Sequence, residues 1–267
     1  MNEEESKALS INAERSEINL DENTADRMAA LFRGLLGTVP VVGSMLGEVI
    51  TVEIPNQRMD RVVLTIKVLA QKLSYIEEEV LCQKMRSEKF TDLLQDAMAQ
   101  AARSLSDERR EYIASFLKNS LTSEELDHVY EKKLLAILGE LNDAEIIFLR
   151  HASLRPYERQ EFFEQHKDVL GPVPAVIGSP RALLDKYALR TSFQDKLLEL
   201  SLLARTFVKT EAGKMPEMDE NTGTLKVRSI DVTQLGRALL RYIDQPASSD
   251  KDEDEFLAQK RKISKQE

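Results

Sequence analysis

Seven apolar residues after Pro55 recur at alternating intervals of three and four, and this spacing constrains the fold more than any other feature of the sequence. They are Met59, Val62, Ile66, Leu69, Leu73, Ile76 and Val80. Such spacing predicts a long helix with one apolar stripe, as in coiled coils and helical bundles. Two interpretations follow: the stripe is an oligomer seam between two copies of the chain, or it is filled by other helices of the same chain.

Further helical patterns occupy the chain from residue 25 to residue 139. Apolar residues recur at helical intervals around Phe90–Ala101, Ile113–Leu117 and Leu126–Leu138. Thr122 and Glu125 have the spacing of a capping box, which would begin the last of these helices. The connections are short, and short connections favour antiparallel neighbours, so we expect a helical bundle over residues 25–139.

The two ends of the sequence lack apolar periodicity. Residues 1–24 are polar and acidic, and residues 245–267 mix charges of both signs. We expect a disordered acidic leader and a disordered charged tail. The first residues are acidic where a secretory signal is basic and then apolar, so the simplest compartment is the cytoplasm of a prokaryote-like cell.

Reactive residue types are too few and too scattered to suggest an enzyme. Cys82 is the one cysteine, and His128, His151 and His166 are too far apart for a local set of metal ligands. The sequence contains no phosphate-binding glycine loop, dinucleotide fingerprint or nucleophile elbow. We therefore expect no catalytic residues, no cofactor, no metal and no small-molecule substrate.

The pattern changes after Gly139 into a module of helices and a small β-hairpin over residues 140–244. Asn142 and Glu145 are spaced to cap one helix, and Thr191 and Gln194 to cap another. Residues 206–209 and 224–230 have strand character, with a polar, turn-rich segment between them and a last helix after them. The predicted fold class is mainly α, with an N-terminal helical bundle and this C-terminal module.

The order of these elements, with two local motifs, resembles the winged-helix domain of MarR-like bacterial regulators. The run Val232-Thr233-Gln234-Leu235-Gly236-Arg237 is similar to the segment in which that family re-enters a helix after its wing. The run Leu200-Ser201-Leu202-Leu203 is similar to the end of the recognition helix, with Ser201 where the family usually has Gly. A Gly in the first turn of the last helix also suggests that this helix approaches the strand pair closely.

The resemblance implies a recognition helix for the major groove and a wing for phosphates. The residues that could contact nucleic acid are Arg190, Ser192, Gln194, Lys196, Lys226 and Arg228. Residues 141–244 contain 15 Lys+Arg and 15 Asp+Glu, and the segment between the strands is acidic. Phosphate binding depends on excess positive charge, so DNA is a disfavoured partner and a protein partner is preferred.

A second distinctive segment runs from Gly34 to Gly47 with no charged residue. Its 14 residues fall short of the ~20 that span a bilayer, and Pro40 divides it. It is expected either to cover the bundle core or to contact a membrane surface. The residues for membrane contact would be Leu35, Leu36, Val39, Val41, Val42, Met45 and Leu46.

The stretch from Gly34 to Arg61 also resembles the start of helical-bundle proteins encoded near bacterial immune and prophage genes. Together these observations predict a non-enzymatic intracellular interaction protein that oligomerises or docks a protein partner, with a role in bacterial antiviral defence as one setting. Two alternatives remain open: a DNA-binding regulator, and a membrane-perturbing defence effector that uses the Gly34–Gly47 segment.

Overall fold

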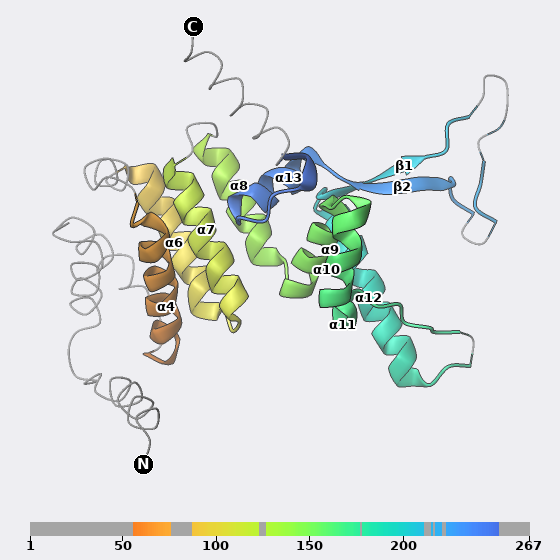
Figure 1. Cartoon of the computed structure of the whole chain (residues 1–267), viewed down its shortest axis with the longest axis horizontal. Helices are drawn as coiled ribbons and strands as arrows, with labels where there is room; N and C mark the ends of the chain where they lie inside the picture. The colour runs from red at the N-terminus through yellow and green to blue at the C-terminus, as the bar shows by residue number, and fades with distance from the viewer. Residues whose placement is uncertain are drawn as a thin grey trace, which may run out of the picture.

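The computed structural model has a helical body from which a β-hairpin projects (Figure 1). The structure describes residues 56–75, 87–122, 127–176, 178–210, 215, 217–220 and 223–250. Within these ranges the chain is mainly helical, with one small two-stranded antiparallel sheet. The predicted mainly α class is confirmed at this level.

The first part is a bundle of four helices. It contains α4 (Asn56–Leu73), α6 (Glu88–Arg103), α7 (Asp107–Thr122) and α8 (His128–Glu140). α4 packs on α6 and α7, and α6 also packs on α8 (Figure 1). Three alanines of α6, at positions 97, 101 and 102, are at most 4% exposed and allow close approach of its neighbours.

The apolar stripe of α4 is filled within this bundle. Val62, Ile66, Leu69 and Leu73 are 0–1% exposed and belong to the core shared with α6 and α7. An oligomer seam through these four residues is therefore wrong, because their side chains have no surface left for a second copy. The Met59 side chain, Ile76 and Val80 lie outside the described residues.

The second part follows without a long connection. It contains α9 (Asp143–Ser153), α10 (Pro156–Gln165), α11 (Lys167–Leu170), α12 (Arg181–Glu199), β1 (Leu203–Phe207), β2 (Val227–Val232) and α13 (Gln234–Tyr242). The predicted cap of α9 is confirmed as a capping box: Glu145 N donates to Asn142 Oδ1 at 2.9 Å, and Asn142 N donates to Glu145 Oε2 at 2.7 Å.

Two other predicted caps are wrong. Thr122 is the last residue of α7, and its hydroxyl donates to the carbonyl of Lys118. Thr191 lies inside α12, which continues unbroken to Glu199, and its hydroxyl donates to the carbonyl of Tyr187 at 3.0 Å. Hydroxyls inside helices commonly bond the preceding turn in this way, so the same local spacing arises without a helix start.

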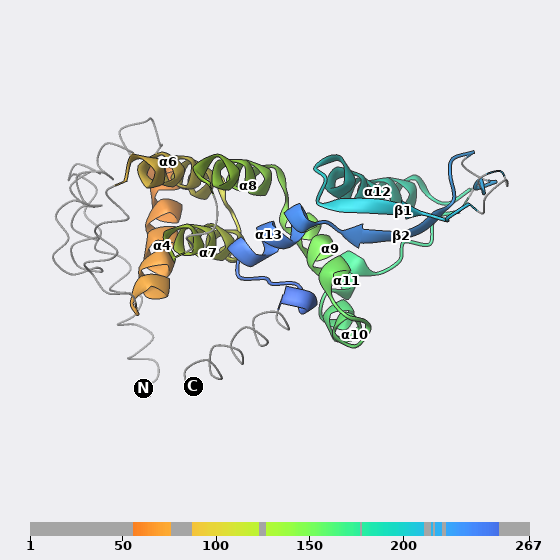
Figure 2. The same cartoon turned by 90° about the horizontal axis from the view of Figure 1, so that it is seen from above.

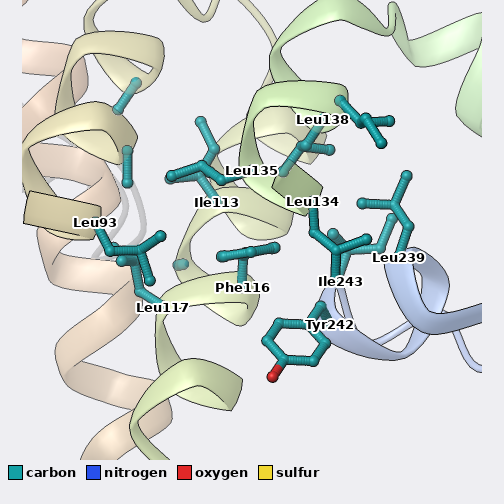
Figure 3. Close-up of a cluster of buried hydrophobic side chains, with 14 of the residues drawn as sticks. Leu93, Ile113, Phe116, Leu117, Leu134, Leu135, Leu138, Leu239, Tyr242 and Ile243 are labelled. Carbon is teal, nitrogen blue, oxygen red and sulfur yellow. The ribbon is translucent and has the colours of Figure 1, made fainter. Parts of the chain in front are cut away.

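α13 joins the two parts. Its Tyr242 ring lies 5.0 Å from the Phe116 ring of α7, and Leu239 and Ile243 are at most 1% exposed. Figure 3 shows these side chains meeting those of α7 and α8. The last helix of the second part thus completes the core of the first, and one continuous apolar cluster runs through both.

Residues 245–250, shortly after the end of α13, pack against the fold rather than being disordered. Ala247, Ser248 and Asp250 are at most 7% exposed. Arg150 of α9 donates to the carbonyl of Pro246, and the backbone N–H of Arg155 donates to Ser248 Oγ at 3.0 Å. The expectation of a disordered tail is wrong for residues 245–250, while residues 251–267 lie outside the described part.

Candidate functional site

α12 ends in a sharp turn that leads directly into β1. Leu202 N donates to the carbonyl of Leu197 at 2.9 Å, and Ser201 N donates to that of Leu198 at 3.0 Å, which together form a Schellman motif. Ser201 occupies the left-handed position of this motif with φ 59°. Glycine is favoured there because a Cβ is strained in that conformation.

The last helix, α13, passes close to the place where β1 begins at Leu203 and β2 ends at Val232. We call this end of the hairpin its root. Thr233 N donates to the carbonyl of Leu202 at 3.0 Å, and the Thr233 hydroxyl accepts from Gly236 N at 3.0 Å. A Cβ on Gly236 would lie 2.4 Å from the Leu202 carbonyl oxygen and 2.9 Å from Val232 Cγ2. The predicted close approach of Gly236 to the strand pair is confirmed.

Beyond this root, one face of the hairpin is apolar. Phe207 of β1 stands opposite Val227 of β2, and Met218 bridges Leu225 farther out. Cross-strand partners share a face and alternate residues return to it, so these four side chains lie together. We call Phe207, Met218, Leu225 and Val227 the hairpin face. Their side chains are 38–53% exposed.

The opposite face of the hairpin is polar. The hydroxyls of Thr206 and Ser229 both bond Asp231 Oδ2, at 3.2 and 2.6 Å. Lys226 pairs with Glu217 at 3.0 Å. The hairpin is therefore amphipathic, and it projects past the helices (Figures 1 and 2).

α12 turns an exposed face toward the same side. Arg205, two residues before Phe207, pairs with Asp195 of α12 at 3.6 Å. Leu184 precedes Asp195 by eleven residues, close to three helical turns, so these two lie on the same side of α12, and Tyr187 lies within one turn of Leu184. Leu184 and Tyr187 are 43% and 50% exposed. From this contact α12 and the hairpin diverge (Figure 1).

The outer half of α12, residues 181–189, is mostly exposed. Leu197, near the end of α12, is the one buried residue of the helix. Pro180 at the N-cap offers no side-chain hydrogen bond, and no acidic residue lies in the first turn. Helices of this length depend on packing for most of their stability, and the outer half of α12 packs little against the described part of the chain.

The six residues predicted to contact nucleic acid do not form one cationic face. Arg190 donates to the carbonyl of Leu170 at 2.5 Å and stacks 5.3 Å above the Phe148 ring, so it joins elements of the fold. Lys196 bonds Glu140 at 3.1 Å, and this hydrogen bond raises the pKa of Lys196. Both cations are engaged within the chain.

The other four are scattered. Lys226 pairs with Glu217, as above, and the Ser192 hydroxyl donates to the carbonyl of Leu189 in its own helix at 2.6 Å. Gln194 is half-buried and Arg228 is exposed. Arg228 is the member of the set best placed to meet a phosphate.

A cleft of about 360 Å³ lies where the ends of α6, α7, α8 and α9 meet. Its deepest cation, Arg109, donates to the carbonyls of Leu138 and Leu141 and pairs with Asp143 at 3.4 Å. Burial lowers the pKa of Arg109, and Asp143 acts in the opposite direction. Because these bonds cap the C-terminal end of α8, the arginine has a structural role.

Within the described ranges, no group of three His, Cys, Asp or Glu side chains could hold a metal ion. No helix in the same part of the chain has the length and apolarity to cross a membrane. The residues named for membrane contact, Leu35 to Leu46, and Cys82 lie outside the described residues.

No protein-family model matches the chain, and no curated protein or solved structure matches it either.

The hairpin face was missed by sequence reasoning. Its signal was the alternation of Leu225 and Val227 with Lys226 and Arg228, which is typical of an amphipathic strand.

Proposed function

We propose that the chain is a non-enzymatic interaction protein that docks a protein partner on the hairpin face. The observation that carries the proposal is the exposure of four large apolar side chains on one side of a projecting hairpin. A two-stranded hairpin is marginally stable alone in water, and clustered exposed apolar side chains mark interaction sites. A partner would supply the contacts that this face lacks.

We further propose that residues 140–244 form a winged-helix-like module. The element order supports this: α9, α10 with α11, α12, the β1–β2 hairpin and α13. The left-handed backbone of Ser201 supports it as well, because the MarR-like family usually has Gly at the corresponding place.

Duplex DNA is the weaker partner for this module. Arg190, Lys196 and Lys226 are already bonded within the chain. Residues 141–244 carry 15 basic and 15 acidic side chains, so little excess positive charge is left for phosphates. An apolar hairpin face is better suited to protein than to a phosphate backbone.

The proposal is tested by photo-crosslinking in cells that make the chain. Phe207 is replaced with p-benzoylphenylalanine, and the matched control places the same residue at Thr206, on the polar face. The expected result is a protein adduct from position 207 and little or none from position 206. Equal labelling at both positions, or none at either, would contradict docking on the hairpin face.

A further inference from the structure

We infer that His151 makes the contact between α9 and α10 sensitive to acid: when its ring takes up a proton, α10 opens locally from α9. The contact involves none of the residues of the hairpin face. Two structural features carry the inference, namely the weak packing of α10 and the two arginines that flank the His151 ring.

α10 is weakly packed. None of its residues is buried, and it lies at the outer edge of the helical body in Figure 2. Its two phenylalanines, Phe162 and Phe163, are only half-buried, and no side-chain hydrogen bond caps its first turn. Segments with few buried apolar contacts open locally at a small cost in free energy. A modest change at the contact with α9 is therefore enough to shift the balance between closed and open α10.

His151 lies in the last turn of α9, at the contact with α10. Its ring is half-buried and lies 6.3 Å from the Phe163 ring. One helical turn before Phe163, the Arg159 side chain donates to the carbonyl of Leu154 at 2.9 Å and to that of Ala152 at 3.4 Å. α10 thus brings an aromatic ring and a guanidinium group to the end of α9 that carries His151.

A second guanidinium group approaches from α12. Arg190 lies over the Phe148 ring at 5.3 Å, and Phe148 is one helical turn before His151 on the same side of α9. The Arg190 side chain donates to the carbonyl of Leu170 at the end of α11. Arg159 and Arg190 both bond carbonyl oxygens rather than carboxylates in these contacts, so their positive charges are not neutralised there.

These surroundings oppose a charge on His151. Burial lowers the pKa of His151, and the positive charges of Arg159 and Arg190 lower the pKa further. The acidic side chains of the elements around α9 are directed elsewhere or exposed. Glu158 accepts from Ser248, Glu164 pairs with Lys167, Asp195 pairs with Arg205, Asp231 accepts from Thr206 and Ser229, Asp250 pairs with Arg241, and Glu161, Asp168, Asp185 and Glu199 are exposed.

Little else in the contact would stabilise a protonated ring. The Phe163 ring lies beyond the ~6 Å within which an aromatic face attracts a cation. Carbonyl oxygens at a helix end favour a charged histidine, but here those of Ala152 and Leu154 already accept from Arg159. When α10 opens, His151 reaches water and regains its ordinary pKa of ~6.5. Protonation therefore favours the open form, and the closed form loses stability as the pH falls below ~6.5 toward the lowered pKa.

The test is amide hydrogen exchange of residues 156–165 in the full chain at about pH 7.5 and about pH 5, corrected for the intrinsic exchange rate at each pH. Glutamates stay mostly ionised over this range, because their ordinary pKa is ~4.3. In wild type the protection of α10 should fall at least about fivefold at the lower pH, since each unit by which the pKa of His151 is lowered corresponds to about tenfold. In His151→Gln, whose side chain does not titrate, protection should change less than about twofold.

His166→Gln is the matched control. The His166 ring lies 4.4 Å from the Phe162 ring of the same helix, and this variant should keep the wild-type response to pH. In wild type, an NMR titration of the His151 ring should give a pKa below ~6.5, and this measurement decides the matter even if His151→Gln does not fold. A His151 pKa at or above ~6.5, equal protection of α10 at both pH values, or loss of the response in His166→Gln rather than in His151→Gln would each overturn the inference.

Discussion

The Thr233 hydroxyl donates a 2.7 Å hydrogen bond to the backbone carbonyl of Ser201, which lies 32 residues earlier in the chain. This bond ties the end of α12 to the start of α13, and the hairpin projects from between them. The same hydroxyl accepts from Gly236 N and so caps α13. This joint therefore fixes the point from which the hairpin projects.

Gly236→Ala should destabilise the chain. Ala is normally favoured over Gly in a helix by ~1 kcal/mol, but here its Cβ would lie 2.4 Å from the Leu202 carbonyl oxygen. We expect a net loss of about 1–3 kcal/mol in the free energy of unfolding, measured by urea denaturation. Gly139→Ala is the control, because its Cβ would meet the flexible end of Gln100 and should cost less. A Gly236→Ala variant at least as stable as wild type would contradict the close packing.

Ser201→Gly should stabilise the chain. A non-glycine residue in the left-handed region carries a strain of ~1–2 kcal/mol, which glycine relieves at some cost in unfolded-state entropy. We expect a net gain of about 0.5–1 kcal/mol in the free energy of unfolding. Ser201→Val should destabilise, since a β-branched residue suits φ 59° poorly. Thermal unfolding of the three proteins compares them, and a Gly variant less stable than wild type would count against this account.

Asp244→Asn should make stability less sensitive to acid. Burial raises the pKa of Asp244, but hydrogen bonds from Lys118 at 2.6 Å, Asn119 at 3.0 Å and Ser115 outweigh burial and hold the pKa below its ordinary value. A lowered pKa stabilises the folded chain above the unfolded pKa of ~3.9, and that stabilisation is lost as the pH falls through the folded pKa.

The measurement is the urea midpoint of both proteins at pH 6 and at pH 3. Wild type should exceed the Asn variant at pH 6, and the difference should shrink at pH 3. Asn also tolerates the left-handed backbone of position 244, φ 57°, so the substitution isolates the charge. A difference that stays constant between the two pH values would show that the Asp244 carboxylate is not responsible.

The full chain should bind duplex DNA weakly or not at all at ~150 mM salt, the regime in which nonspecific affinity falls to ~10⁻⁴–10⁻⁶ M. The affinity for phosphates depends on free Lys and Arg side chains, and Arg190, Lys196 and Lys226 are engaged within the chain. The check is a titration against mixed-sequence and genomic fragments. Submicromolar, sequence-selective binding that Arg228→Glu abolishes would make the DNA-binding regulator the better description.

Patterns confined to one helix were the most predictable from sequence. The spacing of Val62, Ile66, Leu69 and Leu73 indicated a buried stripe, and the cap at Asn142 and Glu145 formed as expected. Which surface covers the stripe was not predictable, because a periodic apolar face suits the chain's own helices and a second copy equally well. Capping patterns at Thr122 and Thr191 failed because hydroxyls inside helices can bond the preceding turn.

The candidate site was harder to predict because its composition depends on register. A shift of pairing between Thr206 and Phe207 determines which strand residues share a face, and a slip of one residue exchanges the two faces. Likewise, nothing local in the α13 sequence indicates that Tyr242 will meet Phe116 of α7. Long-range contacts of this kind follow from the whole fold.

The position of α13 sets an order of events during synthesis. Leu239, Tyr242 and Ile243 cover core residues of α7 and α8 that are made more than a hundred residues earlier. Until those three have left the ribosome, the bundle exposes an apolar surface to the cell. The early helices therefore depend on the late one, and a chain stopped before residue 239 should be a target for chaperones and proteases rather than a stable fragment.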